Sequence, residues 1–115
     1  MRNSDSKKTT FLELFIFVVK EGKPTDEELE KLGRDIADIW VKLGRRLGVS
    51  DPKCREIERA YVLLSEKGYH MLQHWKQIKG DDATYQALCK ALQHELVQRQ
   101  DLVEKFCCVK GNYLL

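Results

Sequence analysis

Residues 40–61 constrain the fold more than any other stretch, because two short helices joined by a tight break are predicted from WVKLGRRLGVSDPKCREIERAY. Apolar side chains recur at helical spacing on both sides of the break, at Trp40, Leu43 and Leu47 before it and at Ile57 and Tyr61 after it. Gly48 is expected to end the first helix, since glycine tolerates the left-handed conformation of a C-terminal cap. Ser50 or Asp51 can cap the second helix, and Pro52 suits its first turn.

Amphipathic segments on either side extend this pair into a helical bundle. Before it, Thr25 and Glu28 predict a capping box, in which each side chain accepts a hydrogen bond from a backbone amide. The stripe of this first helix is Leu29, Leu32, Ile36 and Trp40. After the pair, further helices are expected from a cap at Ser65 to about Ile78, from a cap at 80–82, and from a cap at Asp101. Helical periodicity with short loops predicts an all-α bundle of six helices.

An apolar run, FLELFIFVV, stands outside this pattern at Phe11 to Val19. It is too short to span a bilayer as a helix. One interpretation is an extra helix or strand that packs on the domain, and the other is an element for self-association or for a membrane surface. The predicted organisation is an N-terminal segment at 1–24, one domain at 25–108 and a tail at 109–115.

Composition excludes some classes of protein. The formal net charge of +2 is too small to indicate a nucleic-acid-binding protein by itself. The four cysteines form no CxxC pair and no zinc pattern, so a reducing, intracellular compartment is expected. Cys54 and Cys89 fall within helical patterns and are predicted to be buried thiols. Cys107 and Cys108 are interpreted as a frayed helix end, the alternative being a lipidation or redox site.

Residues that could carry catalysis or bind a metal are sparse. His70 and His74 share a helix face, but HMLQH lacks a glutamate at metalloprotease spacing and a third ligand, so both are expected to face solvent. His94 stands alone and is expected on the surface. Trp40 and Trp75 lie on apolar stripes and are predicted to pack in the core rather than to anchor an interface. We therefore expect no catalytic residues, no metal and no cofactor.

The charge pattern is the most informative sign of a binding function. From Asp26 to Asp38 there are six acidic and two basic residues, a net charge of −4, whereas Lys42 to Arg59 carries six basic and three acidic residues, a net charge of +3. The candidate basic patch is Arg45, Arg46, Lys53, Arg55 and Arg59, and the candidate acidic patch is Asp26, Glu28 and Asp35. Complementary patches of this kind steer protein association and set its register. The alternative is an ordinary solvated surface.

The order of these signatures resembles the death domain, a six-helix antiparallel bundle. Trp40-x-x-Leu43-x-x-x-Leu47-Gly48-Val49-Ser50 is similar to the family's second helix, and Ile57 with Tyr61 to its third. Trp75, then Gly80-Asp81-Asp82-Ala83-Thr84, resembles the fourth helix and the opening of the fifth. Leu88, Ala91, Leu92, Leu102 and Val103 complete the pattern. Within the family the chain looks most like the death domain of the Fas-associated adaptor, with looser similarity to ankyrins and netrin receptors. Gly68 departs from the pattern, since a larger apolar residue is usual there.

The resemblance implies a cytoplasmic adaptor in apoptosis or innate immunity that binds other death-domain proteins, whether receptors, adaptors or kinases, and that self-associates. It implies no nucleic acid and no membrane span. A second interpretation is a helix-turn-helix domain, in which LGVSDPKCREIER supplies the turn and the recognition helix, whose arginines and Lys53 meet phosphates.

Overall fold

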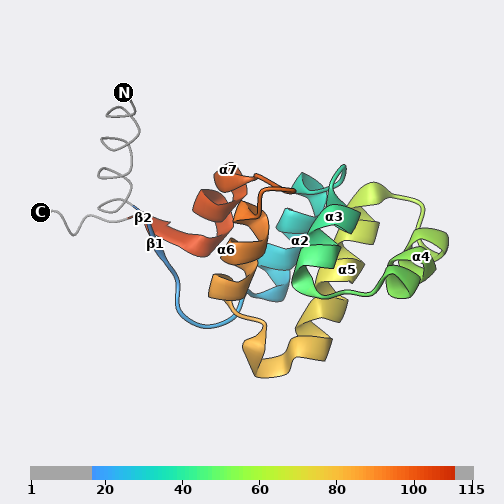
Figure 1. The fold of residues 1–115 in the computed structure, drawn as a ribbon, viewed down its shortest axis with the longest axis horizontal. Helices are drawn as coiled ribbons and strands as arrows, with labels where there is room; N and C mark the ends of the chain where they lie inside the picture. Colours follow the sequence, from blue (N-terminus) through green and yellow to red (C-terminus); the bar gives the residue numbers. More distant parts are fainter. Residues whose placement is uncertain (1–16, 111–115) are drawn as a thin grey trace, which may run out of the picture.

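The computed structural model describes residues 17–110, and Figure 1 shows their fold. In this part of the chain six helices form a bundle, and the last of them, α7, continues directly into a π-helical turn, η2. The elements are β1 (Phe17–Val19), α2 (Asp26–Asp35), α3 (Trp40–Leu47), α4 (Asp51–Ala60), α5 (Leu64–Lys79), the 3-10 turn η1 (Gly80–Asp82), α6 (Tyr85–Gln93), α7 (Gln100–Leu102), η2 (Val103–Cys107) and β2 (Cys108–Lys110). The predicted all-α, six-helix bundle is confirmed.

The apolar stripes of the helices meet in one core. Both tryptophans lie in it, as predicted, since Trp40 is 4% exposed and Trp75 is 1% exposed. Figure 1 places α5 against α2 and α3, while α4 lies at one end of the long axis and the paired strands lie at the other. Opposite ends of the bundle therefore present different surfaces to solvent.

Two glycines set the closest helix crossing, between α2 and α5. A Cβ at Gly68 would lie 2.7 Å from the carbonyl oxygen of Gly33, and a Cβ at Gly33 would lie 2.7 Å from the amide nitrogen of Tyr69. Each distance is to backbone, which cannot rotate away as a side chain can. Gly68, the position at which the chain departs from the family pattern, is therefore required by the approach of the two helices.

Three predicted helix boundaries are confirmed by their hydrogen bonds. Thr25 Oγ1 accepts from the Glu28 amide at 3.1 Å, and Glu28 Oε1 accepts from the Thr25 amide at 2.9 Å, which completes the capping box. Gly48 ends α3 with a φ of 89°. Ser50 Oγ accepts from the Lys53 amide at 3.2 Å and caps α4.

The first predicted helix ends earlier than its apolar stripe suggested. α2 ends at Asp35, a turn occupies residues 36–39, and Trp40 begins α3. The turn is closed by a hydrogen bond from the Ile39 amide to the Ile36 carbonyl. Because Ile36 and Trp40 are both buried, the spacing of apolar residues could not distinguish one continuous helix from two helices meeting at a buried turn.

Three predicted caps are wrong. α5 begins at Leu64, so Ser65 lies inside the helix. Asp82 lies in η1, and α6 is capped instead by Thr84, whose Oγ1 accepts from the Ala87 amide at 3.1 Å. Asp101 forms a two-point ion pair with Arg99 rather than capping the last helix. In each case a residue close by in the chain occupies the N-cap position instead: Leu63, Thr84 or Arg99.

The described end of the apolar run is a strand. β1 pairs antiparallel with β2, with Val18 opposite Val109 and Val19 opposite Cys108. The start of the predicted tail, Val109 and Lys110, is therefore part of a strand, and the extra helix is not found at Phe17–Val19. The remainder of the run, residues 11–16, and the tail from 111 lie outside the described residues.

The cysteines are all free and buried. This confirms the prediction for Cys54 and Cys89, whereas the predicted frayed end at Cys107 and Cys108 is wrong, because Cys107 is fully buried in η2 and Cys108 is buried in β2. Burial, followed by its proximity to Cys89 and Cys108, raises the pKa of Cys107 to about 12. A thiol with such a pKa is a poor nucleophile.

Candidate protein-interaction site

The predicted acidic patch divides into residues that face solvent and residues held inside the domain. Asp26 is exposed at the start of α2 and lies 3.8 Å from Lys76 Nζ. Asp35 pairs with Lys105, with 2.7 Å between Oδ2 and Nζ, and its side chain is only 25% exposed. Glu28 is also partly buried. Only Asp26 of the three predicted acids therefore stands on an open face.

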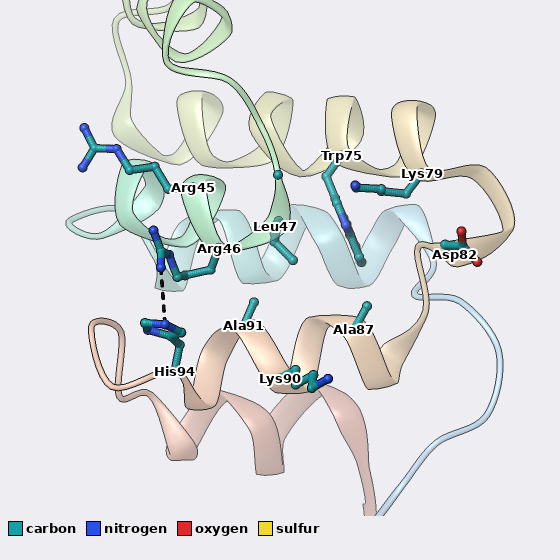
Figure 2. Close-up of a pocket in the computed structure, with 11 residues that line it drawn as sticks. Arg45, Arg46, Leu47, Trp75, Lys79, Asp82, Ala87, Lys90, Ala91 and His94 are labelled. Carbon is teal, nitrogen blue, oxygen red and sulfur yellow. Dashed lines mark hydrogen bonds between the residues drawn. The ribbon is translucent and has the colours of Figure 1, made fainter.

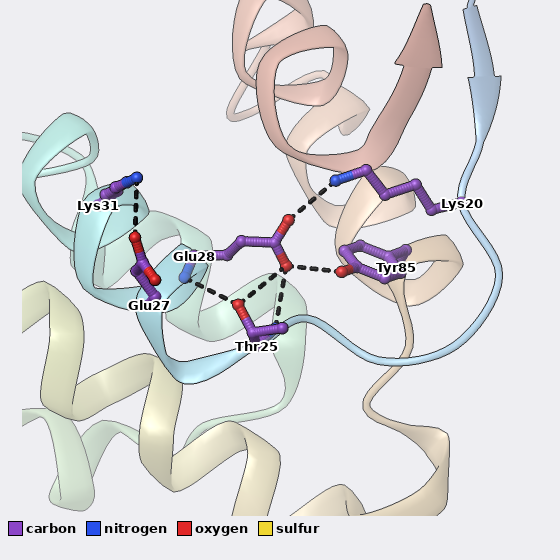
Figure 3. Close-up of polar contacts among 6 residues, drawn as sticks. All are labelled: Lys20, Thr25, Glu27, Glu28, Lys31 and Tyr85. Atoms are coloured by element: carbon purple, nitrogen blue, oxygen red, sulfur yellow. Dashed lines mark hydrogen bonds and ion pairs between the residues drawn. The ribbon is translucent and has the colours of Figure 1, made fainter.

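Glu28 is the centre of an internal polar network, shown in Figure 3. Its carboxylate accepts hydrogen bonds from Lys20 Nζ at 2.8 Å and from the Tyr85 hydroxyl at 2.6 Å, in addition to the Thr25 amide. Burial by itself would raise the pKa of Glu28, but these donors outweigh it and lower the pKa to about 2. Burial and the bond to Glu28 raise the pKa of Tyr85 to about 12. The network joins β1, α2 and α6, so Glu28 is a structural residue.

An acidic hollow nevertheless lies beside Asp26. It is lined by residues from α2 and the start of α5, namely Asp26, Glu27, Glu30, Lys31, Arg34, Ser65 and Glu66. Glu27 pairs with Lys31 one turn along the helix. Glu30 makes no side-chain hydrogen bond or ion pair with any other described residue. Asp26 and Glu30 are four residues apart and so share one face of α2.

The structure places the residues of the predicted basic patch around more than one hollow. Arg45 pairs with Asp51 at 3.1 Å and lies near Arg55 in a hollow under Trp40. Arg46 points elsewhere, toward His94 of the loop after α6, as Figure 2 shows. Lys53 pairs with Glu56 at 3.3 Å and faces the end of α5. Arg45 therefore lines both the hollow of Arg55 and that of Arg46, whereas Lys53 lines a third hollow.

Arg55 and Arg59 are the two basic residues with no internal partner. No other residue among 17–110 forms a side-chain hydrogen bond or ion pair with either arginine. The acids of α4 are all engaged, because Asp51 pairs with Arg45, Glu56 with Lys53, and Glu58 with Lys67. Since Arg55 and Arg59 are four residues apart on α4, they present two uncompensated charges on one face.

Sequence reasoning missed the cations that the fold brings to Arg46. Lys79 ends α5, Lys90 lies on α6, and both line the same hollow as Arg46 and His94. These residues are far apart in sequence, so no spacing pattern could have grouped them. The histidines also differ from expectation: His70 stacks on Tyr61 with ring centroids 3.9 Å apart, and His94 faces Arg46 rather than standing alone.

A metal site would require at least three histidine, cysteine or acidic side chains close together, and residues 17–110 contain no such group. None of the helices between residues 17 and 110 combines the length and apolar content that a membrane span needs.

The comparison with known protein families identifies the bundle. The model of the Death domain matches residues 26–106, from the start of α2 into η2. No curated protein matches the chain in sequence. The family match covers most of the chain and agrees with six helices packed around Trp40 and Trp75. The chain therefore belongs to the Death domain family, whose members are protein–protein interaction modules.

Proposed function

We propose that this death domain is a signalling adaptor module of apoptosis or innate immunity, and that it assembles with other death domains through opposite charges on α4 and α2. The observation that carries the proposal is the pair of unpartnered cations, Arg55 and Arg59, on a helix whose own acids are all engaged. The closer relation to the death domain of the Fas-associated adaptor stays part of this proposal.

The spacing of the charges supports direct pairing. Arg55 and Arg59 are one helical turn apart on α4, and Asp26 and Glu30 are one turn apart on α2, so both pairs are separated by a rise of about 6 Å. Asp26 is retained from the predicted acidic patch because its pair with Lys76 is long, at 3.8 Å, and leaves its side chain 71% exposed, whereas Glu28 and Asp35 are held by Lys20 and Lys105. Two antiparallel or parallel helices could align these charges in register.

The geometry of the contact predicts a growing assembly. The two faces belong to different helices, so a contact between them is heterologous and leaves one free face at each end. Exposed ion pairs contribute about 0.2–1 kcal/mol each, so a single contact is weak. Repetition along an assembly, or a cluster of receptor chains, would strengthen it.

A charge-exchange experiment tests the contact. One variant carries Arg55→Glu with Arg59→Glu, and the other carries Asp26→Lys with Glu30→Lys. Each alone should fail to self-associate at low salt in sedimentation velocity, whereas an equal mixture should associate because each restores the face that the other lacks. Lys79→Glu with Lys90→Glu is the matched control, since it changes the net charge equally on another surface and should leave self-association unchanged.

The result that contradicts the proposal is equally clear. If Arg55→Glu with Arg59→Glu melts like the wild type and still self-associates to the same extent, these arginines are not in the contact. Duplex DNA titrated into the same proteins tests the helix-turn-helix alternative, because binding that falls steeply with salt and disappears with the two arginines would favour it.

A further inference from the structure

An open hollow of about 620 Å³ lies between α3, the end of α5 and α6, away from Arg55 and Arg59 (Figure 2). Arg46 comes from α3, Lys79 from the end of α5, Lys90 from α6 and His94 from the residue after α6. Ala87 and Ala91 face the hollow from α6, and their small side chains leave it open on that side. Three helices thus direct cationic or polar side chains toward one open space.

Arg46 and His94 meet in an arrangement that lacks an acceptor. His94 Nδ1 accepts a hydrogen bond from the Leu96 amide at 3.1 Å, which requires the neutral imidazole to carry its proton on Nε2. That Nε2 lies 3.3 Å from Arg46 Nη1, which is also a donor. Two N–H groups cannot bond each other, so both donors are available to one acceptor placed beside them.

The other charges define the two ends of the hollow. Lys90 and Lys79 form no side-chain hydrogen bond or ion pair with another described residue. Asp82 is the one carboxylate among the lining residues, and Figure 2 shows it at the end opposite His94. Figure 2 shows the side chains of Lys79 and Lys90 between the Arg46–His94 end of the hollow and Asp82. The Arg46–His94 end and the two lysines therefore attract an acidic group, and the end formed by Asp82 repels one.

We infer that this hollow binds a short acidic segment of a partner protein, with one carboxylate held by Arg46 and the Nε2–H of His94, and with Lys90 adding positive charge further along the segment. The segment continues toward Asp82 with an uncharged or basic residue. Guanidinium and imidazole donors match the oxygens of a carboxylate. This site goes beyond the proposed contact between death domains, because it uses a different surface and a linear segment rather than a folded partner.

The charge layout favours a polypeptide over a continuous polyanion. A nucleic acid or a polyphosphate would place a second negative charge at the Asp82 end, where like charges repel. A peptide can alternate its charges along the hollow. The experiment below distinguishes a linear segment from a folded partner, such as a second copy of the chain.

The test is a titration of the whole chain with a fluorescent peptide in which a single glutamate is followed by uncharged residues, monitored by anisotropy at low salt. We expect saturable binding that is absent for the same peptide with glutamine in place of the glutamate. Lys90→Glu should weaken binding about five- to tenfold, because it replaces an attraction by a repulsion at an exposed site. Arg59→Glu, which changes the net charge equally but lies on α4, should leave peptide binding unchanged.

The two variants separate this inference from the proposed function. Lys90→Glu should lose peptide binding and keep self-association, whereas Arg59→Glu should keep peptide binding and weaken self-association. The inference is overturned if both variants weaken the peptide equally, if Lys90→Glu also abolishes self-association, or if inorganic phosphate at the peptide concentration displaces the peptide. Thermal melting of each variant excludes loss of the fold as the cause.

Nitrogen-15 spectra of the histidine rings provide a second test that does not depend on a mutation. His94 should be the Nε2–H tautomer, and its ring nitrogens should shift on addition of the glutamate peptide. A neutral His94 that carries its proton on Nδ1 would refute the convergence of donors and, with it, the inferred site.

Discussion

Replacing Gly68 by alanine should destabilise the domain, although alanine is the better helix former. The new Cβ would lie 2.7 Å from the Gly33 carbonyl oxygen and 3.1 Å from the Gly33 Cα. Ordinary contact begins at 3.4 Å, so α2 must move by about 0.7 Å relative to α5. The atoms in the way are backbone atoms of a packed helix, so no side chain can rotate to make room.

The expected magnitude is the difference between two effects. Overpacking of a dense interior costs about 1–3 kcal/mol. Alanine in a helix is favoured over glycine by about 1 kcal/mol, which offsets part of that cost. We therefore expect the free energy of unfolding to fall by up to about 2 kcal/mol, which lowers Tm by up to roughly 16 °C for a domain of this size.

Gly44→Ala is the matched control, because Gly44 is also in the interior of a helix. A Cβ there would meet the Met71 side chain, with Cγ at 3.2 Å and Sδ at 3.4 Å. Since methionine is flexible, it can yield, and Gly44→Ala should be neutral or stabilising by up to about 1 kcal/mol. Urea and thermal unfolding of the two variants should give changes of opposite sign. Stabilisation of Gly68→Ala by the same amount as Gly44→Ala would refute the close crossing of α2 and α5.

Three further predictions concern the core and its polar network. The pKa of Glu28 is lowered to about 2 from its ordinary value of 4.5, so the stability that its carboxylate contributes is complete above about pH 4.5 and is progressively lost toward pH 2. The difference in unfolding free energy between the wild type and Glu28→Gln, measured by urea titration, should therefore shrink over that range. Deleting residues 1–22 removes β1, the Lys20–Glu28 ion pair and the Gly22 carbonyl that accepts a hydrogen bond from the Tyr85 amide. The deletion should lower Tm or change the oligomeric state seen by light scattering, and no change in either would show that the segment does not support the bundle. Trp40→Ala should lower the free energy of unfolding by about 3–5 kcal/mol, and a melting curve like that of the wild type would contradict its place in the core.

Local sequence preferences predicted the helices well where the deciding partner is near in the chain. The Thr25–Glu28 capping box, the left-handed Gly48 and the Ser50 cap each involve residues within four positions of one another. The caps at Ser65, Asp82 and Asp101 failed because the N-cap positions are instead Leu63, Thr84 and Arg99, and local preference could not rank these neighbours. The pairing of β1 with β2 joins distant parts of the chain, so no local pattern could reveal it.

The sequence by itself determined that this chain is a bundle of six amphipathic helices with both tryptophans inside, because apolar residues that recur with the helical period form one buried face on each helix. It also indicated an acidic first helix and basic residues after it. Only the tertiary structure decided which charges remain available, because a charge is available when no distant partner neutralises it. Glu28 and Asp35 are held by Lys20 and Lys105, while Arg46 is brought to Lys90 and His94. These partners come together only when the helices pack, and their positions depend on contacts that span the whole chain.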